Sequence, residues 1–241
     1  MLNAYILSTQ QLLQYPAAPS SLYSTTDLTT WINEGRNQLA GQSNCVRFLA
    51  SLPFVSAQNV YPYSAISLSG ATGIASVLHV RDMWLQVASG QVKMRPRSWE
   101  WFGQYEFNAA IPNTGQPIVW AQYAQGGLLS LYVSPIPNAA FTALLDCVCL
   151  PAALSTDASP EVIPALWTDA VPYYAAYKAL LSAQSVARQA DAERMFNRFE
   201  EFANRGRKAA TPEVLPGQYE QQMSPVRPNQ LGLGKSKGLL G

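Results

Sequence analysis

Residues 83–96, MWLQVASGQVKMRP, predict a β-hairpin that sets the character of the middle of this chain. Short alternating runs flank Ser89-Gly90, and such a pair between two runs is typical of a tight hairpin turn. Similar apolar or alternating runs, separated by turn residues, extend from about Cys45 to Leu150. Gly126-Gly127 predicts a second hairpin in the same way. We therefore predict that residues 45–150 form an antiparallel β-rich domain.

One segment of this domain departs from the strand pattern. Residues 98–107, SWEWFGQYEF, predict a short helix lined by Trp99, Phe102 and Phe107.

Helical periodicity precedes the β-rich domain. Ser8 and Gln11 predict a capped short helix that ends before Pro16. Asp27 predicts the N-cap of a second helix that Gly41 ends. The predicted buried stripe of this second helix consists of Leu28, Trp31, Ile32, Gly35 and Leu39.

Helical periodicity returns after Pro151. Ser159 or Asp157 predicts the start of a helix with Pro160 in its first turn, and Pro172 predicts a kink or a division. Its stripe is Ile163, Leu166, Trp167, Ala170, Tyr174, Tyr177 and Leu181. A last helix at about residues 186–205 has the stripe Ala192, Met195, Phe196, Phe199 and Phe202.

The apolar stripes at the two ends of the chain need partners, and each end supplies one for the other. We therefore predict an α+β fold in which residues 1–44 and residues 151–211 together build a helical body. The β-rich domain, residues 45–150, is inserted between them. Residues 212–241 form a separate, extended C-terminal arm.

The arm is rich in proline and glycine, which prevent a continuous helix or strand. Ordering it would cost roughly 1–2 kcal/mol per residue, so it is expected to order only against a partner. A frayed terminus is the alternative interpretation. Its end contains spaced leucines and lysines, which are the candidate residues for binding such a partner: Leu231, Leu233, Lys235, Lys237, Leu239 and Leu240.

Composition limits the classes of function. The chain has 241 residues, a formal net charge of +1 and only 13% charged residues, so no global basic field favours tight nucleic-acid binding. Six tryptophans and twelve tyrosines suggest surface held in subunit contacts. No apolar run is long enough to span a bilayer, and the N-terminus lacks the pattern of a secretory signal. Three cysteines indicate buried, reduced thiols of a protein made in a cytoplasm.

Catalytic and metal-binding patterns are weak. The single histidine, His79, lies in an alternating run and is interpreted as a hydrogen-bonded sheet residue. Cys147 and Cys149 form a CxC pair without the further ligands that zinc needs. Carboxylates that would suit glycan hydrolysis are Glu34, Asp82, Glu100 and Glu106, but nothing in the sequence brings two of them together. No catalytic residue, metal or cofactor is therefore predicted.

Two groups of basic residues are candidates for subunit or DNA contacts. Lys93, Arg95 and Arg97 alternate through one strand and are expected on one face, beside Trp99 and Trp101. A subunit contact or a polar sheet face is the favoured interpretation of this group. The second group, Arg205, Arg207 and Lys208, ends the last helix, where cations complement the helix dipole.

Several stretches in order resemble tailed-bacteriophage head-to-tail adaptor proteins. The helix DLTTWINEGRNQLAGQSNCVR (27–47) resembles the IN-x-x-R…A…CVR helix of that family. RPRSWEWFGQY (95–105), GQPIVWAQY (115–123), LYVSPIPN (131–138) and LDCVCLPAAL (145–154) are similar to the motifs of its β-containing members. EVIPALWTDAVPYYAAYKALLSAQ (161–184) and DAERMFNRFEEF (191–202) are similar to its paired C-terminal helices.

The resemblance implies a non-enzymatic virion protein at the head-tail junction, synthesised in the host cytoplasm. Its partners would be further copies of itself in a ring, expected to be a dodecamer, with the portal protein above and the tail nozzle protein below. The ring would extend the DNA exit channel, contact the passing genome without sequence specificity and avoid membranes. The C-terminal arm would climb onto the portal, so the leucines and lysines at its end are the predicted portal-docking residues.

Two other functions remain open at this stage. One is a virion-associated peptidoglycan hydrolase that uses Glu34 and Glu100. The other is a carbohydrate- or receptor-binding module built on Trp84, Trp99, Trp101 and Trp120.

Overall fold

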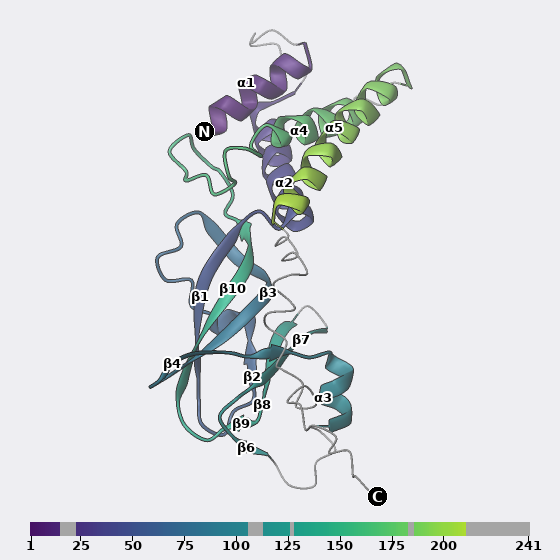
Figure 1. Cartoon of the computed structure of the whole chain (residues 1–241). Coiled ribbons are helices and arrows are strands. Elements are labelled where there is room, and N and C mark those ends of the chain that lie inside the picture. Colours follow the sequence, from purple (N-terminus) through teal and green to yellow (C-terminus); the bar gives the residue numbers. More distant parts are fainter. Residues whose placement is uncertain (15–22, 106–112, 126–127, 183–185, 211–241) are drawn as a thin grey trace, which may run out of the picture. The chain divides into compact units, whose positions relative to one another are not determined.

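The structure of this chain is a computed structural model that describes residues 1–14, 23–105, 113–125, 128–182 and 186–210 (Figure 1). Two helices, α1 (Leu2–Leu12) and α2 (Thr25–Ser43), precede the first strand. Two more, α4 (Ala170–Ser182) and α5 (Val186–Ala210), follow the last strand. Strands occupy the middle, together with the short helix α3 (Trp99–Tyr105). The predicted α+β class, with helices from both ends, is confirmed.

The strands form two four-stranded sheets within the described residues. The first has the order β1-β10-β3-β4, from β1 (Arg47–Phe54), β10 (Phe141–Pro151), β3 (Ile74–Val87) and β4 (Gly90–Lys93). The second has the order β2-β8-β7-β5, from β2 (Val60–Pro62), β8 (Leu128–Ser134), β7 (Val119–Gln125) and β5 (Arg95–Pro96). A small pair joins β6 (Thr114–Gly115) to β9 (Ile136–Pro137), and the one-turn helix η1 (Tyr63–Ala65) follows β2. The long pairings are antiparallel, whereas β5–β7 and β6–β9 are short parallel pairs.

Both predicted hairpins are present. In the β3–β4 hairpin Val87 pairs with Gly90, so the turn residues are Ala88 and Ser89, one position earlier than predicted. Gly90 has a φ of 131°, a conformation that favours glycine. In the β7–β8 hairpin Gln125 pairs with Leu128, and the predicted turn, residues 126–127, lies outside the described residues.

The interior strand β10 is buried on both faces. Leu145, Cys147, Val148 and Cys149 are all inaccessible, which agrees with their continuous apolar run. Both thiols are free, and burial raises the pKa of Cys147 to about 12 and that of Cys149 to about 11.

A glutamine joins the two large sheets. The Gln122 side chain of β7 donates to the Val80 carbonyl of β3 at 2.8 Å and accepts from the Val80 N–H at 2.9 Å. The Tyr63 hydroxyl also donates to Gln122, and burial raises the pKa of Tyr63 to about 12. These bonds satisfy buried polar groups and fix one sheet against the other.

The predicted start of the first helix is wrong. Helix α1 begins at Leu2 rather than after Ser8, and buries Leu2, Tyr5, Ile6 and Thr9. Its first N–H groups are satisfied from far along the chain, because the Asp157 carboxylate accepts from the Asn3 N–H at 3.1 Å. The same carboxylate pairs with the Met1 amino group.

Helix α2 is capped one turn earlier than predicted. Ser24 is the N-cap: its hydroxyl accepts from the Asp27 N–H at 3.1 Å and donates to the Asp27 carboxylate at 2.7 Å. The helix also runs past Gly41, and Asn44 ends it with a φ of 56°. Of its predicted stripe, Leu28, Ile32, Gly35 and Leu39 are buried, while Trp31 is half-buried.

The predicted helix start near Asp157–Pro160 is also wrong, since α4 begins at Ala170. In the segment before α4, the Glu161 carboxylate accepts hydrogen bonds from the Val162 and Ile163 N–H groups at 2.9 Å each. These backbone groups are therefore bonded to a side chain and not within a helix. Pro172 lies in the first turn of α4, where no backbone donor is required, and neither divides nor ends it. Helix α5 spans the predicted last helix and extends it to Ala210.

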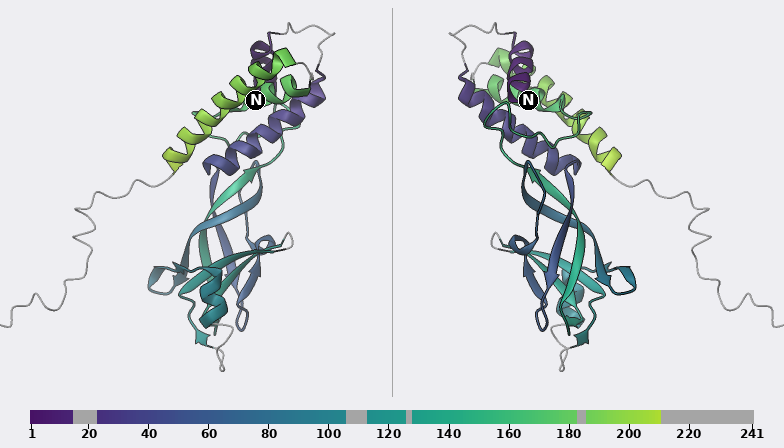
Figure 2. Two further views of the ribbon diagram at one scale, coloured as in Figure 1. Left: turned by 90° about the vertical axis from the view of Figure 1, so that its right-hand side faces the viewer. Right: turned by 90° about the vertical axis from the view of Figure 1, so that its left-hand side faces the viewer.

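The helices from the two ends pack together, as predicted (Figure 2). The Tyr174 ring of α4 lies against Phe199 of α5, with ring centroids 5.1 Å apart. Glycines allow close approach: a Cβ on Gly35 would lie 3.1 Å from Tyr174, and one on Gly206 would lie 2.9 Å from Ser43. One continuous core joins these helices to both sheets within the compact unit Met1–Ala210. The domain boundaries predicted inside this unit stay predictions.

Candidate functional site

The predicted basic group lies where the chain passes from one sheet to the other. Lys93 ends β4, and Arg95 begins β5. Met94, between them, is fully buried, and its N–H donates to the Met83 carbonyl of β3 at 2.9 Å. The N–H of the next residue, Arg95, donates instead to the Ile118 carbonyl, which precedes β7, at 2.9 Å. The strand therefore changes partners within two residues.

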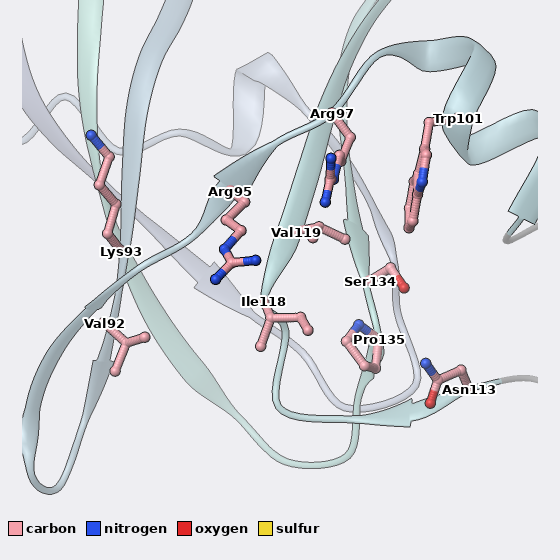
Figure 3. Close-up of a pocket in the computed structure, with 10 residues that line it drawn as sticks. All are labelled: Val92, Lys93, Arg95, Arg97, Trp101, Asn113, Ile118, Val119, Ser134 and Pro135. Atoms are coloured by element: carbon pink, nitrogen blue, oxygen red, sulfur yellow. The ribbon is translucent and has the colours of Figure 1, made fainter. Parts of the chain in front are cut away.

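All three basic residues line one cavity of about 540 Å³ (Figure 3). Only two of them extend into it. The Lys93 ammonium is directed away and forms an ion pair with Asp82 at 2.7 Å, over the Trp84 ring at 5.6 Å. The expectation that all three share a face is therefore wrong for Lys93, because the step at Met94 turns the strand.

Arg95 and Arg97 are held on a common face by β7. The Arg97 N–H donates to the Trp120 carbonyl at 2.8 Å, which completes the parallel pairing that Arg95 begins. The Arg97 guanidinium lies 5.5 Å from the centre of the Trp101 ring. That distance is within the range of a cation–π contact.

Helix α3 positions Trp101. Phe102 is buried, and the Trp99 ring stacks on Tyr123 of β7 with centroids 4.1 Å apart. The Ser98 hydroxyl accepts from the Trp101 N–H at 3.3 Å, at the start of the helix. The short helix predicted here is confirmed at Trp99–Tyr105, and Phe107 lies outside the described residues.

The cavity combines positive charge with an apolar floor. Ile118, Val119 and Pro135 form the floor, and Ile118 remains 54% exposed. Among the described residues, the charged side chains that line it are all cations. The arrangement suits a ligand or protein segment that has both negative charge and apolar surface.

The second basic group lies at the end of α5 and is engaged locally. Arg205 pairs with Glu201 at 2.5 Å and lies 5.9 Å from the centre of the Phe202 ring. The Arg207 guanidinium donates to the Gln42 carbonyl of α2 at 2.9 Å, and Lys208 is exposed in the last turn. Helix-end stabilisation accounts for these contacts.

The acidic residues considered for glycan hydrolysis have separate roles. Glu34 pairs with Lys178 of α4 at 3.1 Å, and Asp82 pairs with Lys93. Glu100 is exposed on α3, and Glu106 lies outside the described residues. His79 lies in β3, and burial lowers its pKa, with the nearby Arg81 charge acting in the same direction.

In the described ranges, no three His, Cys, Asp or Glu side chains gather closely enough to hold a metal ion. Of the tryptophans proposed for carbohydrate binding, Trp120 is buried in the core and Trp99 is stacked on Tyr123.

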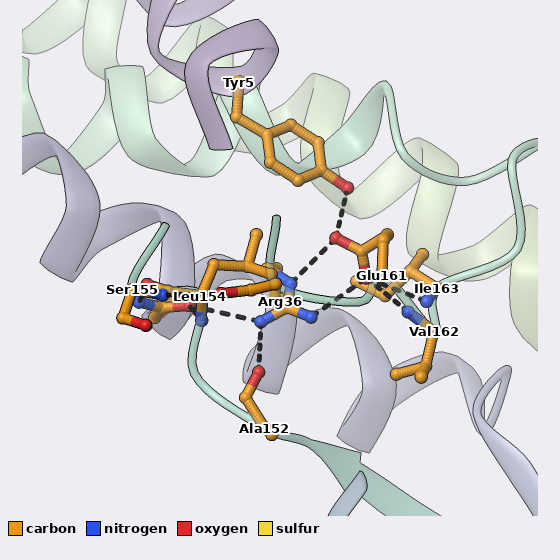
Figure 4. Close-up of polar contacts among 10 residues, drawn as sticks. Tyr5, Arg36, Ala152, Leu154, Ser155, Glu161, Val162 and Ile163 are labelled. Atoms are coloured by element: carbon orange, nitrogen blue, oxygen red, sulfur yellow. Dashed lines mark hydrogen bonds and ion pairs between the residues drawn. The ribbon is translucent and has the colours of Figure 1, made fainter. Parts of the chain in front are cut away.

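A buried polar network links the two ends of the chain (Figure 4). Arg36 of α2 is fully buried and donates to both oxygens of Glu161 at 3.0 Å each. It also donates to the Ala152 carbonyl at 2.6 Å, and Tyr5 of α1 donates to Glu161 at 2.9 Å. Asn33, three residues before Arg36, bonds both backbone groups of Leu154.

The network explains the IN-x-x-R pattern physically. Ile32 is buried in the core. Asn33 and Arg36 lie on one helix face and form hydrogen bonds with the backbone of the segment that follows β10. The sequence pattern alone did not reveal this role. The available signal was an arginine on a helix face otherwise expected to be buried.

The proposed docking residues of the arm, Leu231 to Leu240, lie outside the described residues. Within the part of the chain that the structure describes, every helix is too short or too polar to span a lipid bilayer.

The comparison with protein families defines the class of protein. Residues 8–222 match the family model described as SU10 adaptor protein, a family of structural proteins that connect phage head and tail. The match covers the end of α1, all of α2, α4 and α5, and the whole β-rich middle. The chain belongs to the SU10 adaptor protein family. A search among curated proteins gave no match to this chain.

Proposed function

We propose that this chain is a head-to-tail adaptor whose copies form a closed ring, a dodecamer, between the portal and the tail nozzle of a phage particle. The ring would line the DNA exit channel at the head-tail junction. The observation that carries this proposal is the family match over residues 8–222. The protein would act by contact alone and turn over no substrate, and it would be synthesised in the host cytoplasm.

Exposed apolar side chains support a role in assembly. Leu49 on β1 is 68% exposed, and Leu166, before α4, is 78% exposed. A head-to-tail ring contact uses two different surfaces of each subunit, because each copy meets its neighbours through non-identical patches. Leu49 and Leu166 lie on separate elements and are candidate residues for these two surfaces.

The charge balance supports a conduit for DNA. A net charge of +1 over 241 residues gives no strong field that would hold the genome as it passes. Any contact with DNA would be to phosphates and without sequence specificity. The exposed Lys208 at the end of α5 is one candidate for such a contact.

Residues 212–241 would act as an arm that anchors the ring on the portal. Leucines and lysines at its end provide apolar and charged contacts: Leu231, Leu233, Lys235, Lys237, Leu239 and Leu240. A single arm binds weakly, because ordering it costs conformational entropy. Many identical arms on one ring bind with high avidity.

Truncation tests the arm. Purified full-length chain and a chain ending at residue 230 are each mixed with purified portal and separated by sedimentation. The full-length chain should co-sediment with the portal, and the truncated chain should remain unbound. Equal attachment of both chains would contradict the role of the arm.

A peptidoglycan zymogram tests whether the chain acts by contact alone. No clearing is expected from the purified chain. Clearing that is lost in Glu34→Gln or Glu100→Gln would overturn the non-enzymatic proposal.

A further inference from the structure

The cavity lined by Arg95 and Arg97 presents two cations next to each other. Lys93, the third basic lining residue, is already paired with Asp82 at 2.7 Å. Among the described residues, no ion pair joins Arg95 or Arg97 to a carboxylate. Two neighbouring guanidiniums repel each other, so an anion placed between them gains from both.

The strand that carries Arg95 and Arg97 is fixed, and the Arg97 guanidinium is restrained, before any ligand binds. Backbone bonds of Arg95 and Arg97 to β7, at 2.9 and 2.8 Å, fix the strand that carries them. The Trp101 ring lies under the Arg97 guanidinium at 5.5 Å and limits its movement. Less conformational entropy is therefore lost when a ligand binds.

Exposed apolar side chains lie next to these charges, so a ligand that also has apolar groups binds better than one that has only charge. Ile118 is 54% exposed and Val92 is 40% exposed, and both line the cavity. Its volume of about 540 Å³ is in the range of pockets that accept small ligands or a few side chains. A ligand with negative charge alone would leave this floor in water.

The edge of the sheet favours recognition by side chains. β5 is the outer strand of its sheet, and the N–H groups of Arg95 and Arg97 are directed to β7. Pro96, between them, faces the free edge and has no N–H to offer. A strand added at this edge would therefore find no backbone N–H donor at Pro96. Recognition of a partner then depends on the two guanidiniums and on the apolar floor of the cavity.

We propose that this cavity is a docking site for an extended acidic segment of a partner protein, in which carboxylates and an apolar side chain lie on the same face of the segment. The carboxylates bind Arg95 and Arg97, and an apolar side chain covers Ile118. Duplex DNA fits less well, because it presents phosphates on a convex surface and keeps its apolar base groups in the grooves, away from the phosphates. The proposal rests on the cavity alone and does not require the ring.

Fluorescence anisotropy with the full-length chain tests this proposal. The probe is a short fluorescein-labelled peptide in which every second residue is Asp, Glu, Leu or Ile, so that acidic and apolar side chains share one face of the extended chain, with Thr between them. One comparison peptide has Asn and Gln in place of the acids, and another has Ser in place of Leu and Ile. A labelled oligothymidylate tests nucleic-acid phosphate. The acidic, apolar peptide should bind most tightly of the four.

Variants locate the binding. Arg95→Gln with Arg97→Gln should weaken peptide binding by about tenfold or more, because charge-assisted bonds to two guanidiniums are lost. The control, Arg194→Gln with Arg198→Gln on α5, changes net charge equally and should alter affinity by less than about twofold. Ile118→Ser should weaken binding by roughly threefold or more.

A second double variant covers the case in which the glutamine variant does not fold, as judged by circular dichroism. Arg95→Lys with Arg97→Lys keeps the charge but loses the planar fork, so a loss of several-fold is expected. Full affinity in this variant would contradict recognition by the guanidiniums.

Several results would overturn the proposal. They are absence of saturable peptide binding, equal binding of the neutral peptide, and equal losses in the glutamine variant and its control. Binding of oligothymidylate that depends on Arg95 and Arg97, without binding of the acidic peptide, would identify a nucleic-acid phosphate site in its place.

Discussion

Replacing Glu161 with alanine should destabilise the whole compact unit, because this carboxylate joins three separate parts of the chain. It accepts two bonds from Arg36 of α2, one from Tyr5 of α1 and two from the backbone of Val162 and Ile163. Arg36 is fully buried, so Glu161→Ala leaves a buried charge without its counterion.

The expected cost follows from the burial of both partners. The Arg36 and Glu161 side chains are only 1% and 9% exposed, so solvent screens their interaction weakly. Removing one partner of a buried pair costs about 3–5 kcal/mol. For a folded unit of this size, that loss lowers the Tm by roughly 6–20 °C.

Urea unfolding followed by circular dichroism measures this change. Glu34→Ala is the matched control, because Glu34 lies on α2 in a more exposed pair with Lys178. Removing an exposed pair should cost about 0–1 kcal/mol. Glu161→Gln, which keeps an oxygen for the backbone N–H groups, should cost less than Glu161→Ala.

An equal, small loss in Glu161→Ala and Glu34→Ala would refute the assignment of Glu161 as the fastening point. Arg36→Met combined with Glu161→Gln supplies a further check. The double variant should be more stable than Glu161→Ala, since no buried charge remains without a partner.

Three further predictions concern buried groups. Burial and the Glu161 charge raise the pKa of Tyr5 above its ordinary value of 10, so the neutral phenol is favoured in the folded state and stability is lost as the pH rises beyond 10. In Tyr5→Phe the loss of stability over that range, measured by urea unfolding, should be smaller. Half-buried Cys45 should react with a thiol reagent before Cys147 and Cys149, whose labelling should require unfolding. Gly206→Ala should cost about 1–3 kcal/mol in urea unfolding, because its Cβ would lie 2.9 Å from a side-chain carbon of α2.

An unchanged alkaline stability profile in Tyr5→Phe would show that this phenol does not govern it. Labelling of all three thiols at one rate in the folded protein would contradict the burial of β10. Gly103→Ala, on α3 with open space at its Cβ position, should not destabilise, and a cost equal to that of Gly206→Ala would refute the close-approach argument.

Local patterns predicted much of the fold. Alternation and turn residues predicted the β3–β4 hairpin, and the apolar stripe of Phe196, Phe199 and Phe202 predicted α5. The boundaries that failed depend on distant residues. Helix α1 starts at Leu2 because Asp157, far along the chain, satisfies its first donors.

The same limit applies to the candidate site. The two-residue spacing of Arg95 and Arg97 was sufficient to predict their common face. Lys93 does not share this face, because the backbone bonds Met83 of one sheet at Met94 and Ile118, next to the other sheet, at Arg95. Which sheet a strand pairs with at each position is a tertiary property, so alternation alone does not reveal the change.

The mass of the complex formed with purified portal tests the central claim most directly. Native mass spectrometry of the full-length chain, alone and after mixing with portal, measures how many copies bind. A defined complex with many copies of the chain on each portal, at the mass of a closed ring of twelve, is predicted. A chain that remains unbound, or that binds as one copy, would contradict the adaptor ring.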